Sequence, residues 1–360
     1  MDIETKLDLI KQPPMREVIT EEELRSLLQT KDHPISYDGF EPSGQAHLGL
    51  GLVRAIKVQD LNEAGIKFKF LIADWFGWIN NKMGGNLEKI KKVGEYFVEV
   101  WKALGVDFKK NEVIWTSSYL NDLDYWKRVI SISKITTIQR MMRCSTIMGR
   151  KQGELQDSAQ LLYPAMQVSD IFNLKCDMTQ LGIDQRRANV LAREIGPKLK
   201  LWKPVVASHS LLIGLQGPQK MGGFEEDREL DVEISSKMSK SIPKSFISVH
   251  DSPSEIKEKI RGAFCPEKII KNNPVMEICR MIIFRKLKLF GIKRPQKFGG
   301  PIEFFKYQDL EREFRNGKVH PLDLKNAVSD SLINILKPVR DHFEKHPQFL
   351  EVFKEAEITR

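Results

Sequence analysis

The chain has 360 residues, of which 41% are hydrophobic and 29% are charged, a composition that fits a folded protein and excludes an intrinsically disordered one. Its length is sufficient for two domains, and its net charge of +9 is unevenly distributed. Residues 242–360 contain 23 Lys and Arg against 16 Asp and Glu, which leaves 34 against 32 in the residues before them. This basic C-terminal third favours a polyanion partner such as a nucleic acid, with a solvated basic surface as the alternative.

The N-terminus, MDIETKLDLIKQ, lacks the basic start and apolar core of a secretory signal, and no stretch approaches the roughly 20 apolar residues of a membrane span. We therefore expect a cytoplasmic protein without a membrane segment. The four cysteines are single and far apart in the sequence, at Cys144, Cys176, Cys265 and Cys279. Without a Cys-x-x-Cys pair they indicate neither a disulfide framework nor a zinc site, and we expect no bound metal.

Short apolar or β-branched runs alternate with longer helical patterns in the first part of the chain, at residues 35–37, 68–73, 112–115 and 176–181. This order predicts an α/β domain with a mainly parallel sheet, which binds ligands at the carboxyl ends of its strands. We expect residues 1–30 to form an N-terminal helical segment. Residues 214–234 are rich in Gly and acidic residues and are typical of a long mobile loop.

After about residue 250 the strand signals fade. Segments 254–263, 275–284 and 322–343 have helical patterns and are separated by turns that contain Pro and Gly. The sequence therefore predicts a second, smaller domain that is all-helical.

Residues 37–51 read YDGFEPSGQAHLGLG and place four glycines and a histidine where a strand ends and a helix is expected to begin. Glycine is unfavourable by about 1 kcal/mol relative to alanine inside a helix, so Gly49 and Gly51 indicate that something approaches this backbone closely. A helix N-terminus offers unpaired N–H groups and a positive dipole end, which suit phosphate. We predict that a nucleotide lies here and that His47, in the first turns of the helix, donates to its phosphates; the alternative is a flexible turn with an incidental histidine.

A second motif, KMSKS at residues 237–241, follows the Gly- and acid-rich connection. Two lysines and two hydroxyl groups on a mobile segment can close over a triphosphate and neutralise the charge that develops on departing pyrophosphate. By itself this pentapeptide also fits a solvated basic loop. Its combination with a His-Gly helix start on an α/β sheet favours the phosphate site.

A third pattern lies in LLYPAMQVSDIF, residues 161–172. If residues 163–172 are helical, Tyr163, Gln167 and Asp170 share one face, because they are four and three residues apart. They form a polar stripe among apolar neighbours. The stripe fits either a substrate pocket or a buried structural network.

Together the motifs resemble those of a known family. His47-Leu48-Gly49 and KMSKS look like the two signatures of class I aminoacyl-tRNA synthetases, and YDGFEPSG, LLYPAMQVSD, GIDQR and ADWFGWINNKMGG are similar to tyrosyl-tRNA synthetases of the archaeal and eukaryotic type. The resemblance covers nearly the whole chain. It implies a Rossmann-like catalytic domain that activates L-tyrosine with ATP, with Mg²⁺ as the counter-ion of the nucleotide, and transfers the tyrosyl group to tRNA(Tyr).

The resemblance also assigns roles to residues. It implies that Tyr37 and Asp170 hydrogen-bond the substrate phenol and that Tyr163, Gln167 and Gln185 hold its amino group. The implied catalytic residues are His47, Lys237 and Lys240, within an ATP-binding set of Gly39, Glu41, Ser43, His47, Gly49, Lys237, Met238, Ser239, Lys240 and Ser241. Tyrosyl-tRNA synthetases are the standard example of enzymes that reject phenylalanine through unpaired pocket groups, without editing.

Two positions depart from the family pattern. The histidine signature usually ends in a second histidine, whereas position 50 is Leu. The backbone and the two lysines would then carry more of the phosphate stabilisation, or the enzyme would be weak or inactive. Leu181 stands where many relatives have glycine, which bears on the turn before Gln185.

The basic C-terminal part contains a dense cluster of Arg285, Lys286, Lys288, Lys293, Arg294 and Lys297, followed by Phe298. Lysine and arginine position phosphates, and an exposed aromatic ring can stack on a base. The resemblance implies that KRPQKFGG and HPLDLKN meet the anticodon, with Phe298 and Asp323 at its first base. A core position for Phe298 is the alternative.

By the resemblance, residues 31–241 form the catalytic domain, with an insertion around 110–160 that makes a homodimer and a mobile KMSKS loop around 214–243. Residues 242–360 form the anticodon-binding domain. The nearest alternative function is that of the sister tryptophan enzyme, against which Tyr37 and Asp170 argue because an indole has one donor and no hydroxyl. The other is an RNA-binding or regulatory protein that has kept the fold and lost activity, which only Leu50 favours.

Overall fold

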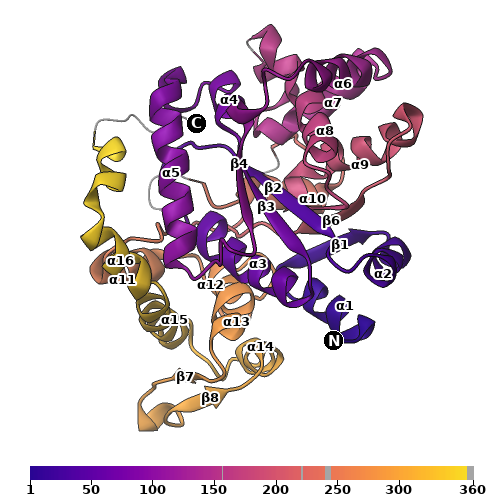
Figure 1. Ribbon diagram of the computed structural model, residues 1–360. Helices are drawn as coiled ribbons and strands as arrows, with labels where there is room; N and C mark the ends of the chain where they lie inside the picture. The colour runs from indigo at the N-terminus through magenta and orange to yellow at the C-terminus, as the bar shows by residue number, and fades with distance from the viewer. Residues whose placement is uncertain (156, 220–221, 240–244, 355–360) are drawn as a thin grey trace.

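The structure is a computed structural model that describes residues 1–155, 157–219, 222–239 and 245–354. A six-stranded sheet in the order β1-β6-β5-β2-β3-β4 lies at its centre (Figure 1). Neighbouring strands pair in parallel, except that β1 pairs antiparallel to β6 at one edge. The strands are β1 (Met15–Ile19), β2 (Ile35–Phe40), β3 (Lys67–Ile72), β4 (Glu112–Trp115), β5 (Met178–Gly182) and β6 (Val205–His209). The predicted α/β class and Rossmann-like parallel sheet are confirmed.

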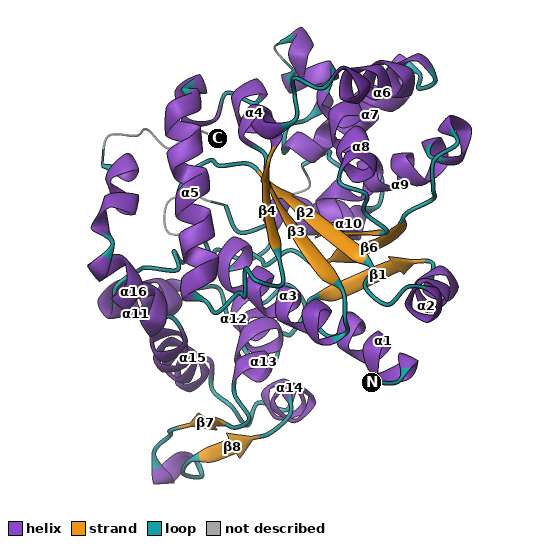
Figure 2. Cartoon of the chain, in the orientation of Figure 1, coloured by secondary structure: helices purple, strands orange, loops and turns teal. Residues whose placement is uncertain are grey.

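Helices cover both faces of the sheet (Figure 2) because successive side chains of a strand point to opposite faces. On β3, Phe68, Phe70 and Ile72 belong to one hydrophobic core, whereas Leu71 belongs to a second. The first core contains residues of α1 (Ile3–Lys11), α2 (Glu21–Thr30), α3 (Arg54–Glu63) and α5 (Leu87–Ala103). The second contains residues of α4 (Asp74–Ile79), α6 (Leu123–Lys134), α7 (Ile138–Cys144), α8 (Tyr163–Asn173) and α9 (Arg186–Ile195).

The C-terminal part, described over residues 245–354, extends the first core and is mostly helical. The prediction that it is all-helical is wrong. Its helices are α11 (Pro253–Gly262), α12 (Pro274–Ile278), α13 (Phe284–Lys286), α14 (Tyr307–Arg315), α15 (Pro321–Ile335) and α16 (Lys337–Lys345). Between them β7 (Phe290–Ile292) and β8 (Ile302–Phe304) form an antiparallel hairpin. Three-residue strands are too short for an alternating pattern to be recognised in sequence, and this pair is held by the burial of Phe290, Ile292 and Phe304.

Two other expectations need correction. Residues 1–30 are not purely helical, because β1 joins the central sheet, where its partner β6 is about 190 residues away in sequence. Residues 214–234 are not one long loop, since Asp227 caps the N-terminus of α10 (Arg228–Ser236). Within this segment the Asp231 carboxylate accepts hydrogen bonds from the backbone N–H groups of residues 222–225, which orders the chain before KMSKS.

Candidate active site

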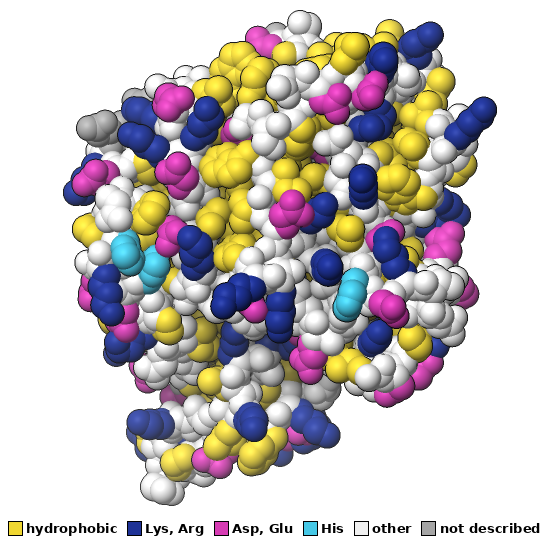
Figure 3. All heavy atoms as spheres, viewed as in Figure 1, with side chains coloured by type: hydrophobic (Ala, Val, Ile, Leu, Met, Phe, Trp, Pro, Cys, Tyr) yellow, Lys and Arg dark blue, Asp and Glu magenta, His cyan; other side chains and the backbone are white. Residues whose placement is uncertain are grey.

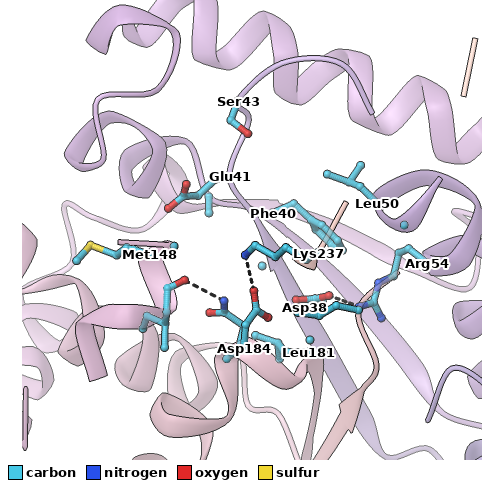
Figure 4. Close-up of a pocket in the computed structure, with 18 of the residues that line it drawn as sticks. Asp38, Phe40, Glu41, Ser43, Leu50, Arg54, Met148, Leu181, Asp184 and Lys237 are labelled. Atoms are coloured by element: carbon cyan, nitrogen blue, oxygen red, sulfur yellow. Dashed lines mark hydrogen bonds and ion pairs between the residues drawn. The ribbon is translucent and has the colours of Figure 1, made fainter. Parts of the chain in front are cut away.

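A pocket of about 430 Å³ opens at the carboxyl ends of β2, β5 and β6. It lies where the strand order reverses, since β2 is followed in sequence by β3 on one side and pairs with β5 on the other. Open parallel sheets bind ligands at such a switch point. Residues from all three sequence motifs line this pocket, which Figure 4 shows in close-up.

The predicted helix at residues 163–172 is confirmed as α8, and its polar stripe faces the pocket. Tyr163, Gln167 and Asp170 are buried and all three line the cavity. Pro164 lies in the first turn of α8, where its missing N–H leaves no hydrogen bond unmade. The stripe is therefore the wall of a pocket.

Tyr37 and Asp170 form the most deeply buried polar part of the lining. Tyr37 Oη and Asp170 Oδ2 are both buried without a hydrogen-bond partner among the described residues. Burial raises the pKa of Asp170 to about 7, although hydrogen bonds from Tyr119 and Tyr125 pull it down. Burial, together with the charge of Asp170, raises the pKa of Tyr37 well above its usual value. An acceptor and a hydroxyl that lack partners can bind one ligand group that both donates and accepts, such as a phenol hydroxyl.

The other end of the stripe carries carboxamides and a carboxylate. Gln167 Nε2 donates to Gln185 Oε1 (3.2 Å), and Gln185 Nε2 donates to the carbonyl oxygen of Ile147 (2.9 Å). Tyr163 Oη donates to Glu41, which also accepts from Asn80 Nδ2 (3.2 Å). The predicted amino-group residues thus lie together, and Glu41, assigned to ATP from the sequence, lies among them. This cluster of oxygen acceptors suits an ammonium group.

The glycine-rich start of α3 has a different physical cause from the one predicted. His47 is not in a helical turn but pairs in a β-bridge with Ser248, and helical structure begins at Gly49. A Cβ at Gly51 would lie 2.6 Å from a methyl carbon of Val249, so this glycine permits close packing of protein on protein. Gly49 lies under the His47 ring, where its N–H donates to Nδ1 (3.1 Å). With Nδ1 as acceptor, neutral His47 carries its proton on Nε2 as a donor.

The other predicted nucleotide residues, Gly39 and Ser43, line the same pocket as His47 and Gly49. Leu50, at the position of the second signature histidine, lines it too and offers no donor from its side chain. Leu181, the second departure, is buried in the pocket wall at the end of β5.

Of the KMSKS motif, Lys237, Met238 and Ser239 are described and line the pocket, while Lys240 and Ser241 lie outside the described residues. The Met238 N–H donates to the carbonyl oxygen of Leu212 (2.7 Å), which fixes the motif beside the sheet. Lys237 Nζ forms an ion pair with Asp184 Oδ2 (2.8 Å), visible in Figure 4. Burial disfavours its charge, but Asp184 outweighs this effect and raises the pKa of Lys237. The lysine is thus cationic and aimed into the cavity.

The sequence reasoning missed a buried polar cluster at the floor of the pocket. Arg54 on α3 forms an ion pair with Asp38 and donates to the carbonyl oxygen of Gln180 (3.2 Å). Burial raises the pKa of Asp38 to about 7 against the pull of Arg54, and burial lowers the pKa of the adjacent His209 well below its usual value. A sequence signal existed, since Arg54 interrupts an apolar helix face and a buried cation requires partners.

Lys82 and Asp184 were also missed. Lys82 lines the pocket, and its Nζ lies 3.7 Å from Glu41 Oε2. Burial lowers the pKa of Lys82. Both Lys82 and Asp184 lie in segments that resemble the family, ADWFGWINNKMGG and GIDQR, but no role was predicted for either residue.

Neither of the predicted anticodon residues, Phe298 and Asp323, lines this pocket. Phe298, in the loop between β7 and β8, is 61% exposed, which excludes a core position. Lys297 Nζ lies 4.9 Å from the centre of its ring, and Asp323 is in the first turn of α15. Part of the basic cluster is already engaged: Arg285 pairs with Asp60 and Lys286 donates to Gln59, both on α3.

The described residues contain no group of three or more His, Cys, Asp or Glu side chains that could hold a metal ion, and all four cysteines are free thiols. Within the same residues, no helix is both long and apolar enough to cross a membrane.

Comparison with known proteins now decides the family. A family model described as tRNA synthetases class I (W and Y) matches residues 29–227 and 231–337. The tyrosine–tRNA ligase of Thermococcus kodakarensis is 48% identical over 375 residues, which cover 100% of both chains. The chain belongs to the tyrosine–tRNA ligases. It is therefore an enzyme of the class I aminoacyl-tRNA synthetase family, whose members use ATP.

Solved structures of this family have the same fold. The tyrosyl-tRNA synthetase of Pyrococcus horikoshii, complexed with L-tyrosine, is 44% identical and superposes with a TM-score of 0.90 over 98% of this chain and 100% of that chain. That of Archaeoglobus fulgidus, also complexed with L-tyrosine, is 36% identical, with a TM-score of 0.85 over 95% and 99% of the two chains.

Proposed function

We propose that this chain activates L-tyrosine with ATP to give tyrosyl-adenylate and pyrophosphate, and then transfers the tyrosyl group to the 3′-terminal adenosine of tRNA(Tyr). The observation that carries this proposal is the pair of unpartnered polar atoms in the pocket, Tyr37 Oη and Asp170 Oδ2. A tyrosine hydroxyl would donate to Asp170 and accept from Tyr37, so that both atoms gain a partner at once.

The substrate amino group would lie at the opposite end of the stripe. Tyr163, Gln167 and Gln185 surround that position, and the Glu41 carboxylate supplies a negative charge for an ammonium group. The substrate carboxylate then faces the nucleotide half of the pocket, where it attacks the α-phosphate and the bond to the pyrophosphate breaks. Catalysis in such a step consists mainly of orientation and of charge stabilisation.

The charge on departing pyrophosphate would be met by His47, Lys237 and Lys240. His47 presents its Nε2–H, and Lys237 can exchange its ion pair with Asp184 for a phosphate oxygen. The remaining ATP-binding residues are Gly39, Glu41, Ser43, Gly49, Met238, Ser239 and Ser241. Mg²⁺ would enter with ATP as part of the substrate.

For tRNA, we propose that the exposed Phe298 stacks on the first anticodon base and that Asp323 contacts it as well. Lysines of the same region that have no protein acceptor in the described part of the chain, such as Lys288 and Lys293, would contact phosphates. We further propose that the enzyme acts as a homodimer in the cytoplasm, where charged tRNA is used for protein synthesis.

The test is the exchange of labelled pyrophosphate into ATP with tyrosine, tryptophan and phenylalanine measured side by side. We expect exchange with tyrosine alone, because only a phenol satisfies both Tyr37 and Asp170. Exchange with tryptophan would overturn the substrate assignment. Absence of exchange with all three, with tRNA binding retained, would identify a relative that has lost activity, with Leu50 as the first position to examine.

A further inference from the structure

Four of the six tyrosines of the chain lie at or directly behind the pocket wall, and two of these are unexplained by the proposed reaction. Tyr119, after β4, donates from Oη to Asp170 Oδ1 (2.8 Å), and Tyr125 on α6 donates to the same oxygen (3.0 Å). Neither of these two tyrosines lines the cavity. They stand behind Asp170, which is only 1% exposed.

The consequence is an asymmetric carboxylate. The terminal torsion of an aspartate side chain is broad and nearly two-fold, so nothing in Asp170 itself distinguishes its two oxygens. Two phenol protons are directed to Oδ1, and Oδ2 keeps no partner in the described structure. Tyr125 is completely buried and its ring lies 5.2 Å from that of Tyr119, so packing fixes both donors.

We propose that Tyr119 and Tyr125 are positioning residues for substrate selection, which hold Asp170 so that Oδ2, together with Tyr37 Oη, is offered to the hydroxyl of the amino acid. This inference rests on the proposed function, because it takes a phenol as the group that meets Oδ2. With Oδ1 saturated, the Tyr37 proton is directed to the substrate. Without the two phenols the carboxylate can turn and accept that proton itself, so that Tyr37 and Asp170 satisfy each other and phenylalanine is no longer penalised.

The experiment uses Tyr119→Phe, Tyr125→Phe and the double variant, which remove single hydroxyl groups and keep the rings. Tyr307→Phe is the matched control, since Tyr307 lies on α14 against Phe284 in the C-terminal part. Pyrophosphate exchange gives the KM for tyrosine, phenylalanine and ATP. Calorimetry of tyrosine and phenylalanine binding without ATP measures selection directly, also for a variant with slow chemistry.

We expect each single variant to raise the KM for tyrosine about tenfold and to leave the KM for ATP unchanged. The ratio of the KM for phenylalanine to the KM for tyrosine should fall by a similar factor. The control should behave as the wild type. A purely structural role would lower the amount of active enzyme and move neither KM nor the ratio.

The inference is overturned if the double variant keeps the wild-type ratio of the KM for phenylalanine to the KM for tyrosine. It is also overturned if the KM values for tyrosine and ATP rise together. The wild-type enzyme separates this failure from a failure of the proposed function. If the wild type exchanges pyrophosphate with tyrosine alone and the variants remain equally selective, only the positioning role is refuted. If the wild type does not bind tyrosine, both the positioning role and the proposed function are refuted.

Discussion

Asp170, to which we assign a role in substrate selection, occupies an unfavourable position for a charge because it is buried. Burial raises its pKa to about 7, from a usual value of 3.8. Between these two values the native state holds a proton that the unfolded state has released, so this group makes the protein less stable as the pH rises from about 4 to about 7. In the native state the ionised acceptor proposed for the tyrosine hydroxyl therefore predominates only above about pH 7, where this loss of stability is complete.

The replacement Asp170→Asn removes this titration and keeps an acceptor for Tyr119 and Tyr125. We predict that it raises the free energy of unfolding by about 2 to 4 kcal/mol at pH 8, and that this gain shrinks as the pH approaches 4. Denaturant unfolding of variant and wild type at pH 5, 6.5 and 8 measures the difference. The same variant should lose tyrosine activation while binding ATP normally. A gain that is independent of pH would show that Asp170 is not the titrating group.

The position of α5 against the sheet depends on one glycine, Gly94. A Cβ at Gly94 would lie 2.5 Å from the indole ring of Trp115 on β4 and 2.6 Å from the Ile72 side chain on β3. The helix therefore approaches the sheet more closely than any other residue would permit at this point. The adjacent β2–α3 connection, with Gly51 against Val249, follows the same rule.

We predict that Gly94→Ala lowers the free energy of unfolding by about 1 to 3 kcal/mol, although alanine is the better helix former, because the added methyl group overpacks the core. The matched control is Gly262→Ala at the end of α11, where an added Cβ has no neighbour within 4 Å. The control should be neutral or slightly stabilising in the same thermal and denaturant unfolding experiments. Equal effects at both positions would contradict the packing argument.

The space-filling view shows hydrophobic side chains at the surface, between charged ones, in the region of α6 and α7 (Figure 3). Leu123, Ile130 and Ile138 are 68%, 52% and 77% exposed, and all three lie within the insertion assigned to the dimer contact. Several large exposed apolar side chains on neighbouring helices mark an interaction surface. A second copy of the chain is the partner that the proposed homodimer requires.

We predict that wild-type protein sediments as a dimer and that Ile138→Glu shifts the equilibrium towards the monomer by at least tenfold, since a charge would be buried without a partner. Ile269→Glu serves as the control, because Ile269 is 49% exposed in the C-terminal part, away from these helices. Sedimentation velocity over a range of concentrations distinguishes the two variants. A wild type that remains monomeric would place the dimer surface, if any, elsewhere.

A buried charged junction joins the N-terminal helix to the C-terminal part of the chain. Asp60 on α3 accepts from Lys57 Nζ (3.3 Å) and from Arg285 Nη1 (3.2 Å). Lys57 Nζ also donates to the carbonyl oxygen of Ile10 (2.6 Å) in α1. The N-terminal helix, the helix that follows His47 and the C-terminal part thus meet at one buried charged junction, which no local pattern of the sequence indicates.

The sequence was informative wherever a signal is local. Strands β2 to β5 appear as short apolar or β-branched runs, and the i, i+4, i+7 spacing of Tyr163, Gln167 and Asp170 placed them on one helix face. It did not predict the short strands β1, β6, β7 and β8, which are held by partners elsewhere in the chain. The prediction that a ligand approaches the backbone at Gly51 was wrong, since the close neighbour there is Val249. Sequence does not distinguish the two cases, because a close approach by a ligand and one by protein both require glycine.

By itself, the sequence determined the α/β class, the family and the polar groups that face the pocket, since these depend on residue type and spacing along one chain segment. Only the tertiary structure decided which oxygen of Asp170 is left for a ligand, because its two donors are 51 and 45 residues away in sequence. It likewise decided that Lys237 points into the cavity through Asp184, 53 residues distant. Hydrogen bonds and ion pairs act over about 3 Å in space, and sequence spacing does not report such distances between separate elements.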